Sequence, residues 1–365
     1  MKKILITLGI VAAVAAAHYF AIKMMVPKNE GKNEEEKSKD AKVLGMEPNT
    51  PPAQKIPDKS RPLPYSYKNA VTGNIKELPD STNATTGILV DLGSRNVLWA
   101  KNPRTSVPIA SMTKMMTALL IFEELATRKD ISLDTVIPVT PTAMKIGGSQ
   151  IYLDVKESFP ISDLLKSVMI VSANDSSELL AEYFSNGNVP VFVARMNQRA
   201  KELMLPGAKF FNPTGLPGAS SAEDNVCSPE GLVLLAEMLM RHPKAVEWAS
   251  TWIDYIRKDS PKPFMMRNHN RLVNECPGVN GMKTGFINRS GFCTTVTCDR
   301  GGVKLACAVT GFKTRKERDE FVKKLLDWGY KKEALMPKAQ KQEFSSNTDQ
   351  LVTKTPGNIN DPVPK

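Results

Sequence analysis

Three short motifs in this chain combine hydroxyl, amide and lysine side chains at spacings that could support nucleophilic catalysis. In chain order they are Ser111-Met112-Thr113-Lys114, Ser172-Ala173-Asn174 and Lys283-Thr284-Gly285. Each pattern is common by itself, and a second Ser-x-Asn occurs at Ser94-Arg95-Asn96, in an expected turn. Ser-x-x-Lys and Lys-Thr-Gly, however, each occur only once, so the ordered set indicates a single site.

The first motif offers a serine nucleophile, which needs a base within hydrogen-bond reach because a hydroxyl is a poor nucleophile at neutral pH. The three histidines of the chain lie at positions 18, 242 and 269. We expect His242 to be a helix cap or a surface residue, and His269 lies in a polar stretch; neither has an evident aspartate partner. A Ser-His-Asp triad is therefore not favoured, and Lys114 is the candidate base.

Ser111 and Lys114 are expected to lie side by side in the first turn of a helix, because residues three apart share a helix face. Pro108 and Ala110 place Ser111 near the start of that helix, where unpaired N–H groups favour developing negative charge. Burial and a nearby cation, for which Lys283 is the candidate, would lower the pKa of Lys114 and leave a neutral amine. Taken alone, the motif also fits a helix-start serine beside a solvated lysine.

The second motif is expected at a corner between two helices. An apolar helical run, Leu164–Val171, precedes it, and another, Leu179–Tyr183, follows it. Such a corner would direct the short side chains of Ser172 and Asn174 into a cleft. Simple helix capping by Ser172 or Asp175 is the alternative.

The third motif is expected on a strand. Gly278 and Gly281 precede it, and a glycine within a strand permits close approach of a second backbone or a ligand. Lys283 and Thr284 have side chains suited to binding a carboxylate.

The elements that must position these motifs are strands at both ends of one domain and helices between them. Strands are expected at 86–90, 96–100, 281–285, 291–298 and 303–310, and helices at about 115–125, within 153–184, at 228–241 and at 315–328. This order predicts an α+β fold with one antiparallel sheet flanked by helices and an inserted all-helical lobe.

Length and composition are consistent with one large catalytic domain, expected at residues 83–332 of the 365. The net charge is +11, but the basic residues are spread out among acidic ones. We therefore expect a solvated basic surface and no nucleic-acid partner. No Cys-x-x-Cys or Cys/His ligand spacing suggests a metal, and no cofactor is expected.

The two ends of the chain differ in composition from this domain. Lys2-Lys3 followed by an apolar run predicts that residues 1–26 are a secretory signal or a membrane anchor, and the length of the run favours an uncleaved anchor. The domain would then lie outside the cytoplasm, in the periplasm or on the outer face of the membrane. Residues 27–82 are rich in proline and charged residues, which predicts a linker whose last part packs on the domain. Residues 333–365 are predicted to form a disordered tail.

Five cysteines are present, an odd number for an oxidising compartment. They are Cys227, Cys276, Cys293, Cys298 and Cys307. If two strands pair across the expected turn at Asp299–Gly302, Cys293 and Cys307 would lie nearly opposite each other and could form a disulfide. Small buried thiols are the alternative.

With these motifs in this order, the chain resembles the serine D-alanyl-D-alanine carboxypeptidases, which are low-molecular-weight penicillin-binding proteins of peptidase family S11. The resemblance covers residues 83–332 and extends to Phe211–Leu216, which looks like the family's Asn-x-x-Gly-Leu element. Asn268–Leu272 and Gly278–Gly285 resemble the approach to its Lys-Thr-Gly strand. The family implies the fold that penicillin-binding proteins share with serine β-lactamases.

The resemblance also implies a role for each motif residue. Ser111 would attack the peptide bond between two terminal D-alanines of a peptidoglycan stem peptide and form an acyl-enzyme, with Lys114 taking its proton. Ser172 would pass a proton to the leaving D-alanine, and Asn174 would hold the substrate amide and Lys114. The remaining candidates would bind the substrate. Lys283, Thr284 and Arg318 would bind its terminal carboxylate. Gly285 and Phe286 would lie at its scissile carbonyl, which would accept hydrogen bonds from the backbone N–H groups of Phe286 and Ser111. Penicillin and other β-lactams would stop the reaction at the acyl stage.

Phe286 is one departure from the family pattern, because some relatives have histidine there; only its backbone N–H is needed. Three other functions are considered. A class A β-lactamase needs a glutamate where this chain has Gly207–Phe211, and none is there. An endopeptidase that cleaves D-alanine cross-links would use the same residues. A non-catalytic peptidoglycan-binding envelope protein would not need the intact serine and lysines.

Overall fold

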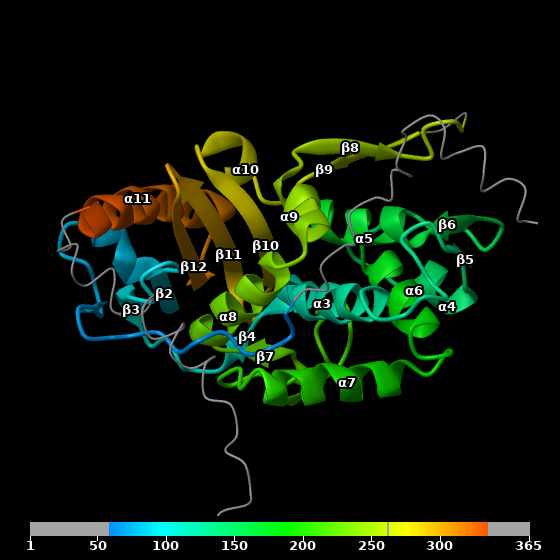
Figure 1. Ribbon diagram of the computed structural model, residues 1–365, viewed down its shortest axis with the longest axis horizontal. Helices are drawn as coiled ribbons and strands as arrows, with labels where there is room; N and C mark the ends of the chain where they lie inside the picture. Colours follow the sequence, from blue (N-terminus) through cyan, green and yellow to red (C-terminus); the bar gives the residue numbers. More distant parts are fainter. Residues whose placement is uncertain (1–57, 261–262, 335–365) are drawn as a thin grey trace, which may run out of the picture. The chain divides into compact units, whose positions relative to one another are not determined.

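The structure is a computed structural model that describes residues 58–260 and 263–334. Figure 1 shows a sheet with helices on both of its sides and a mainly helical region beside it. The main sheet has six strands in the order β1-β3-β2-β12-β11-β10, so β10 is an edge strand of this sheet.

The strands of the main sheet come from both ends of the described chain, as predicted. They are β1 Val71–Thr72, β2 Thr86–Asp91, β3 Val97–Lys101, β10 Val279–Ile287, β11 Gly291–Arg300 and β12 Val303–Phe312. Neighbouring strands are antiparallel except for β1 and β3, which run parallel.

The helices lie mostly between these two groups of strands. They are α3 Lys114–Leu125, α4 Pro141–Lys145, α5 Ile161–Ile170, α6 Asn174–Tyr183, α7 Val189–Glu202, α8 Pro229–Met240, α9 Pro243–Ser250, α10 Leu272–Glu275 and α11 Arg315–Ala334, with 3-10 turns η1 Pro79–Asn83, η2 Ala110–Thr113 and η3 Ser221–Glu223. Short strands pair outside the main sheet: β4 Val107–Pro108 with β7 Val226–Cys227, β5 Val136–Pro138 with β6 Ser158–Pro160, and β8 Ile253–Ile256 with β9 Phe264–Arg267.

The sheet buries both of its faces because alternate side chains of a strand point to opposite sides. On β12, Ala306 and Ala308 belong to a core shared with α3 and α8, whereas Leu305 and Cys307 belong to a core shared with α11. Figure 1 shows α11 and α8 on opposite sides of the strands. The helices α3 to α6 pack together at one end of the sheet and form the predicted helical lobe.

Two expected boundaries differ from the structure. The folded unit begins before residue 83, because Tyr65 and Ile75 are buried and β1 pairs with β3. The segment that precedes α5 is not helical: Ser158–Pro160 forms β6, and α5 begins only at Ile161. The expected signal or anchor at 1–26, the first part of the linker and the tail from 335 lie outside the described residues.

The disulfide suggested by the turn at Asp299–Gly302 is wrong. β11 and β12 do pair across that turn, but their register places Cys307 opposite Val296. Cys293 lies in an irregularity between Phe292 and Thr294, so the two thiols are not cross-strand partners. All five cysteines are buried and free. Burial raises the pKa of the Cys307 thiol, as expected for a cysteine that packs as a small apolar residue.

Within the described ranges, the structure contains no helix that is both long and apolar enough to cross a membrane.

Candidate active site

The first motif lies where η2 passes into α3. Ser111 is in η2, Lys114 is the first residue of α3, and the Lys114 Nζ atom is 3.2 Å from the Ser111 Oγ atom. The Lys114 ammonium also donates to the Asn174 Oδ1 atom at 2.6 Å and to the Thr214 carbonyl. The nucleophile and its candidate base are therefore in contact, and the base is held from two further elements.

Lys114 is in an environment that disfavours its charged form. Its side chain is fully buried, and both this burial and the nearby charge of Lys283 hold its pKa well below the usual lysine range. Asp175 opposes this shift. The predicted effect of Lys283 on the base is thus present in the structure.

The second motif forms the predicted corner between α5 and α6. Ser172 has a φ of +64°, an uncommon conformation for a residue other than glycine. Its hydroxyl is buried and has no hydrogen-bond partner among the described residues. Since buried polar groups are nearly always paired, this hydroxyl is available to a substrate or a water molecule.

Asn174 connects the corner to the base and to the loop before it. Its amide accepts from Lys114 and donates to the Gly147 carbonyl at 2.7 Å. A Cβ atom added at Gly148 would lie 2.6 Å from the Asn174 Nδ2 atom, so only glycine fits beside this amide. The neighbouring Asp175 is not a simple cap: it accepts from the backbone N–H groups of Ile151 and Leu153 and fixes the same loop.

The third motif lies on β10, which contacts η2. A Cβ atom added at Gly285 would lie 2.6 Å from the Ile109 carbonyl oxygen, so glycine permits the close approach of β10 to the segment carrying Ser111. Lys283 and Thr284 are both buried. Burial and the charge of Arg318 lower the pKa of Lys283 to about 7.

Arg318 lies beneath the site. It is buried, and its guanidinium donates to Asp319 and to the Cys293 carbonyl. It acts on the site chiefly through its charge, which reaches Lys283. Phe286, in contrast, is half-exposed and stacks on Phe292 with 4.2 Å between the ring centroids.

Two asparagines build the loop that supplies the Thr214 carbonyl to Lys114. The Asn212 Oδ1 atom accepts from the backbone N–H groups of Thr214 and Gly215. Asn225 donates to the Thr113 hydroxyl at 2.9 Å and to the Asn212 carbonyl at 2.8 Å, which ties the loop to η2. Asn212 was predicted only as part of a resemblance, and Asn225 was not predicted, because its partners are more than ten residues away in the chain.

One of the two histidines in the described residues differs from its expected role. His242 is neither a C-terminal cap nor a surface residue: it is buried before α9 and stacks on Phe122. His269 is pinned near the site by its backbone N–H, which donates to Ile170. The residue is exposed, but crowding by neighbouring groups and the nearby charge of Lys283 lower the pKa of its ring.

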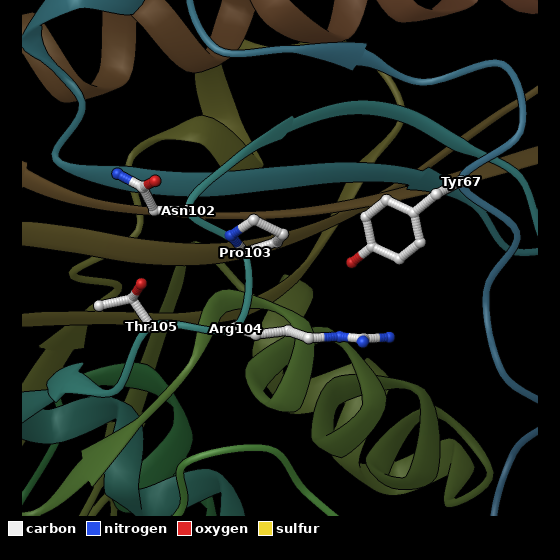
Figure 2. A pocket seen from close by; sticks show the side chains of 5 residues that line it. All are labelled: Tyr67, Asn102, Pro103, Arg104 and Thr105. Carbon is white, nitrogen blue, oxygen red and sulfur yellow. The ribbon is translucent and has the colours of Figure 1, made fainter.

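A separate surface pocket, shown in Figure 2, contains none of the motif residues. It has a volume of about 450 Å³ and is lined by Tyr67 and by Asn102, Pro103, Arg104 and Thr105. The polar ends of Tyr67 and Arg104 both bond to Glu230 of α8, so they connect structural elements and are not available to a ligand. Among the described residues, no cluster of His, Cys, Asp and Glu could hold a metal ion.

Comparisons with known proteins agree with this geometry. The profile of the D-alanyl-D-alanine carboxypeptidase family, peptidase S11, matches residues 73–314. The D-alanyl-D-alanine carboxypeptidase DacF of Bacillus subtilis is 36% identical over 247 residues, which cover 68% of this chain and 62% of DacF. The chain thus matches less than two thirds of the length of that relative.

Two further relatives bear on the site. A D-alanyl-D-alanine endopeptidase of Pseudomonas aeruginosa is 28% identical over 223 residues, 60% of this chain and 68% of the relative. The ampicillin-bound structure of penicillin-binding protein D2 from Listeria monocytogenes is 25% identical, with a TM-score of 0.59, and the match covers 68% of this chain and 97% of that one. Since the family profile matches more than half of the sequence and the solved relative shares the predicted α+β fold, this chain belongs to the D-alanyl-D-alanine carboxypeptidase family, peptidase S11.

Proposed function

We propose that this protein removes the terminal D-alanine from peptidoglycan stem peptides through an acyl-enzyme on Ser111. The observation that carries the proposal is the contact between Ser111 and a buried lysine whose pKa is depressed. Lys114 takes the serine proton as the Oγ atom attacks the carbonyl between the two D-alanines. The leaving D-alanine takes its proton through the unpartnered hydroxyl of Ser172, and water then hydrolyses the ester.

The other motif residues bind and orient the substrate. Lys283 and Thr284 bind the terminal carboxylate, and Arg318 supports them through its charge. The backbone N–H groups of Ser111 and Phe286 stabilise the oxyanion, a contribution of about 3 kcal/mol for each donor. Asn174 keeps Lys114 in place and binds the substrate amide.

A β-lactam should acylate the same serine, since penicillin-binding protein D2 of Listeria monocytogenes has been solved in an ampicillin-bound form. Fluorescent penicillin is expected to label the wild-type protein and not Ser111→Ala, whereas Ser158→Ala, which changes an exposed serine, should be labelled like the wild type. Labelling that persists in Ser111→Ala would overturn the assignment of the nucleophile.

Cleavage of D-alanine cross-links is a second candidate, because one relative is named an endopeptidase. Incubation with a pentapeptide stem and, separately, with cross-linked dimers distinguishes the two activities. Release of free D-alanine from the pentapeptide supports the carboxypeptidase, and cleavage of dimers alone supports the endopeptidase.

The proposed substrate also implies a location outside the cytoplasm, with membrane contact through the N-terminal segment. Lys2-Lys3 and the apolar run that follows support this proposal. Protease added to intact spheroplasts should degrade the catalytic domain, and mass spectrometry of the purified membrane form should recover the uncleaved N-terminus. A domain that stays protected until the cells are lysed would contradict it.

A further inference from the structure

A groove is lined by residues that closely follow or precede two of the motifs in the chain, and it contains none of the motif residues. It has a volume of about 490 Å³, which is within the range of small-ligand sites. Its wall includes Pro108, which precedes Ser111 by three residues, and Phe286, which directly follows Gly285. Because Gly285 contacts the segment between Pro108 and Ser111, the groove continues from the position of the reacting carbonyl.

The direction of a bound stem peptide follows from the proposed function. The terminal carboxylate lies at Lys283 and Thr284, and the reacting carbonyl lies beside Ser111 and Phe286. The remainder of the peptide must therefore leave past Phe286, along the free edge of β10. An extended chain advances about 3.3 Å per residue, so the residue before the D-alanine pair would lie one step beyond Phe286, which itself forms part of the groove wall.

The groove is positively charged. Its lining contains two cationic side chains, Arg289 and Lys313, and no acidic one. Arg289 is neutralised by Asp224, with its Nη2 atom 2.6 Å from a carboxylate oxygen. Lys313 is exposed and has no acidic partner among the described residues, so its charge is available to a ligand.

We propose that this groove, lined by Phe286 and Lys313, binds the stem residue next to the D-alanine pair and prefers a side chain with a carboxylate. The proposal rests on the carboxypeptidase function proposed above. Phe286, which is stacked on Phe292, provides an aromatic wall for the aliphatic part of that side chain, and the Lys313 ammonium pairs with its carboxylate. A stem with a carboxylate at this residue is then favoured over one with a neutral or cationic side chain.

The test compares two peptides of equal shape, N-acetyl-L-Glu-D-Ala-D-Ala and N-acetyl-L-Gln-D-Ala-D-Ala, by release of D-alanine. The wild type should show a kcat/KM for the Glu peptide about two- to five-fold above that for the Gln peptide, the effect of one exposed ion pair. Lys313→Gln should bring the ratio close to one, and Lys313→Glu should invert it. Lys304→Gln, which removes an exposed lysine near the other end of β12, should leave the wild-type ratio unchanged.

Each outcome has one meaning. A wild-type ratio of one, or a ratio unchanged by both Lys313 substitutions, overturns the proposal even if D-alanine is released. A protein that releases D-alanine from neither peptide and is not labelled by penicillin contradicts the carboxypeptidase function, and the groove proposal falls with it. Added salt should reduce the wild-type preference, because an exposed ion pair is screened.

Discussion

A lysine can serve as a general base here because the site makes its ammonium unfavourable. Lys114 is fully buried, and Lys283, a second cation, lies near it. Its hydrogen-bond partners, the Asn174 amide and the Thr214 carbonyl, are neutral oxygens that hold the amine without a carboxylate in direct contact. The same elements that position the base therefore also leave its pKa low.

The pH dependence of the reaction should reflect the protonation states of both Lys283 and Lys114. Lys283 must be protonated to attract the substrate carboxylate, and its pKa is about 7 in the free enzyme. We expect kcat/KM for a D-Ala-D-Ala peptide to fall above about pH 7 as Lys283 loses its proton, and to fall on the acid side as Lys114 gains one. In Lys283→Met the alkaline decrease should be absent, at a lower overall rate. An alkaline decrease unchanged in that variant would assign it to another group.

A substitution at Ser172 should affect activity much more than stability. Its buried hydroxyl has no partner among the described residues, so its removal leaves no other group unpaired and should change the free energy of unfolding by less than about 1 kcal/mol. The same change should lower kcat about 100-fold or more if the hydroxyl carries a proton to the leaving group. Urea unfolding and D-alanine release measured on Ser172→Ala check both parts. A large loss of stability with unchanged kcat would contradict the proton-transfer role.

The sequence could reveal the residues whose types are chemically distinctive, and not those that act through tertiary contacts. Ser111, Lys114 and Lys283 were found because their spacings are rare in combination. Asn225 looks like any loop asparagine, and its importance appears only when the chain brings it to Thr113. The resemblance implied that Arg318 binds the substrate carboxylate, but its burial against Asp319 favours an influence of its charge on Lys283.

At the scale of elements, the site depends on how closely edge strand β10 approaches η2. Gly285 provides this approach, since any side chain there would meet the Ile109 carbonyl. The strand carries Lys283 and the Phe286 N–H, so the roles proposed for both depend on this close approach. The glycine of the third motif is therefore a requirement of packing between two elements.

The substitution Gly285→Ala should increase the distance between β10 and η2. Its methyl group would lie 2.6 Å from a backbone oxygen, so β10 or η2 must shift. We expect penicillin acylation to slow at least about ten-fold, since small displacements of reacting groups are costly. Gly93→Ala is the matched control, because its nearest neighbour is a side-chain oxygen at 3.4 Å, an ordinary contact. Equal acylation rates in the two variants would show that close approach is not required.

Element types could be predicted better than their pairing. The pattern of apolar residues located β10, β11 and β12, but it could not fix the centre of the β11–β12 hairpin, which pairs Arg300 with Val303 and so places Cys307 opposite Val296 and not opposite Cys293. Prolines and charges predicted that residues 27–82 are a linker whose last part packs on the domain, and residues 58–73 do pack, through Tyr65 and Tyr67. Their partners are on α8, far away in sequence, so composition alone could not indicate them.

At the scale of the molecule, residues 58–73 form an N-terminal strap that connects α8 to the strands of the main sheet. Arg241, which follows α8, donates to the backbone carbonyls of Asp58 and Ser60. Further along, Ser66 pairs with Asn96 beside β3. The strap therefore fixes α8 against the edge of the sheet that carries β1 and β3.

The strap depends on a buried ion pair between Arg95 and Glu237 of α8. Their atoms are 2.6 Å apart, Glu237 also accepts from the Tyr65 hydroxyl, and the Arg95 guanidinium lies 4.2 Å from the centroid of the Tyr65 ring. Glu237→Ala leaves the buried Arg95 guanidinium without a carboxylate, with only the Leu63 carbonyl as acceptor among the described residues, and leaves the Tyr65 hydroxyl without its partner, so the free energy of unfolding should fall by about 3 kcal/mol. Glu247→Ala, which breaks an exposed pair with Lys244, should cost less than about 1 kcal/mol.

Urea unfolding of the two variants measures this difference, and penicillin acylation of the folded protein shows whether the strap also affects the site. We expect acylation in Glu237→Ala to stay within about two-fold of the wild type, because Ser111 and Lys114 are held by contacts that do not include the strap. Equal unfolding free energies for the two variants would mean that the strap contributes little to stability. Slower acylation in Glu237→Ala alone would mean that the strap also sets the position of α8 against the sheet.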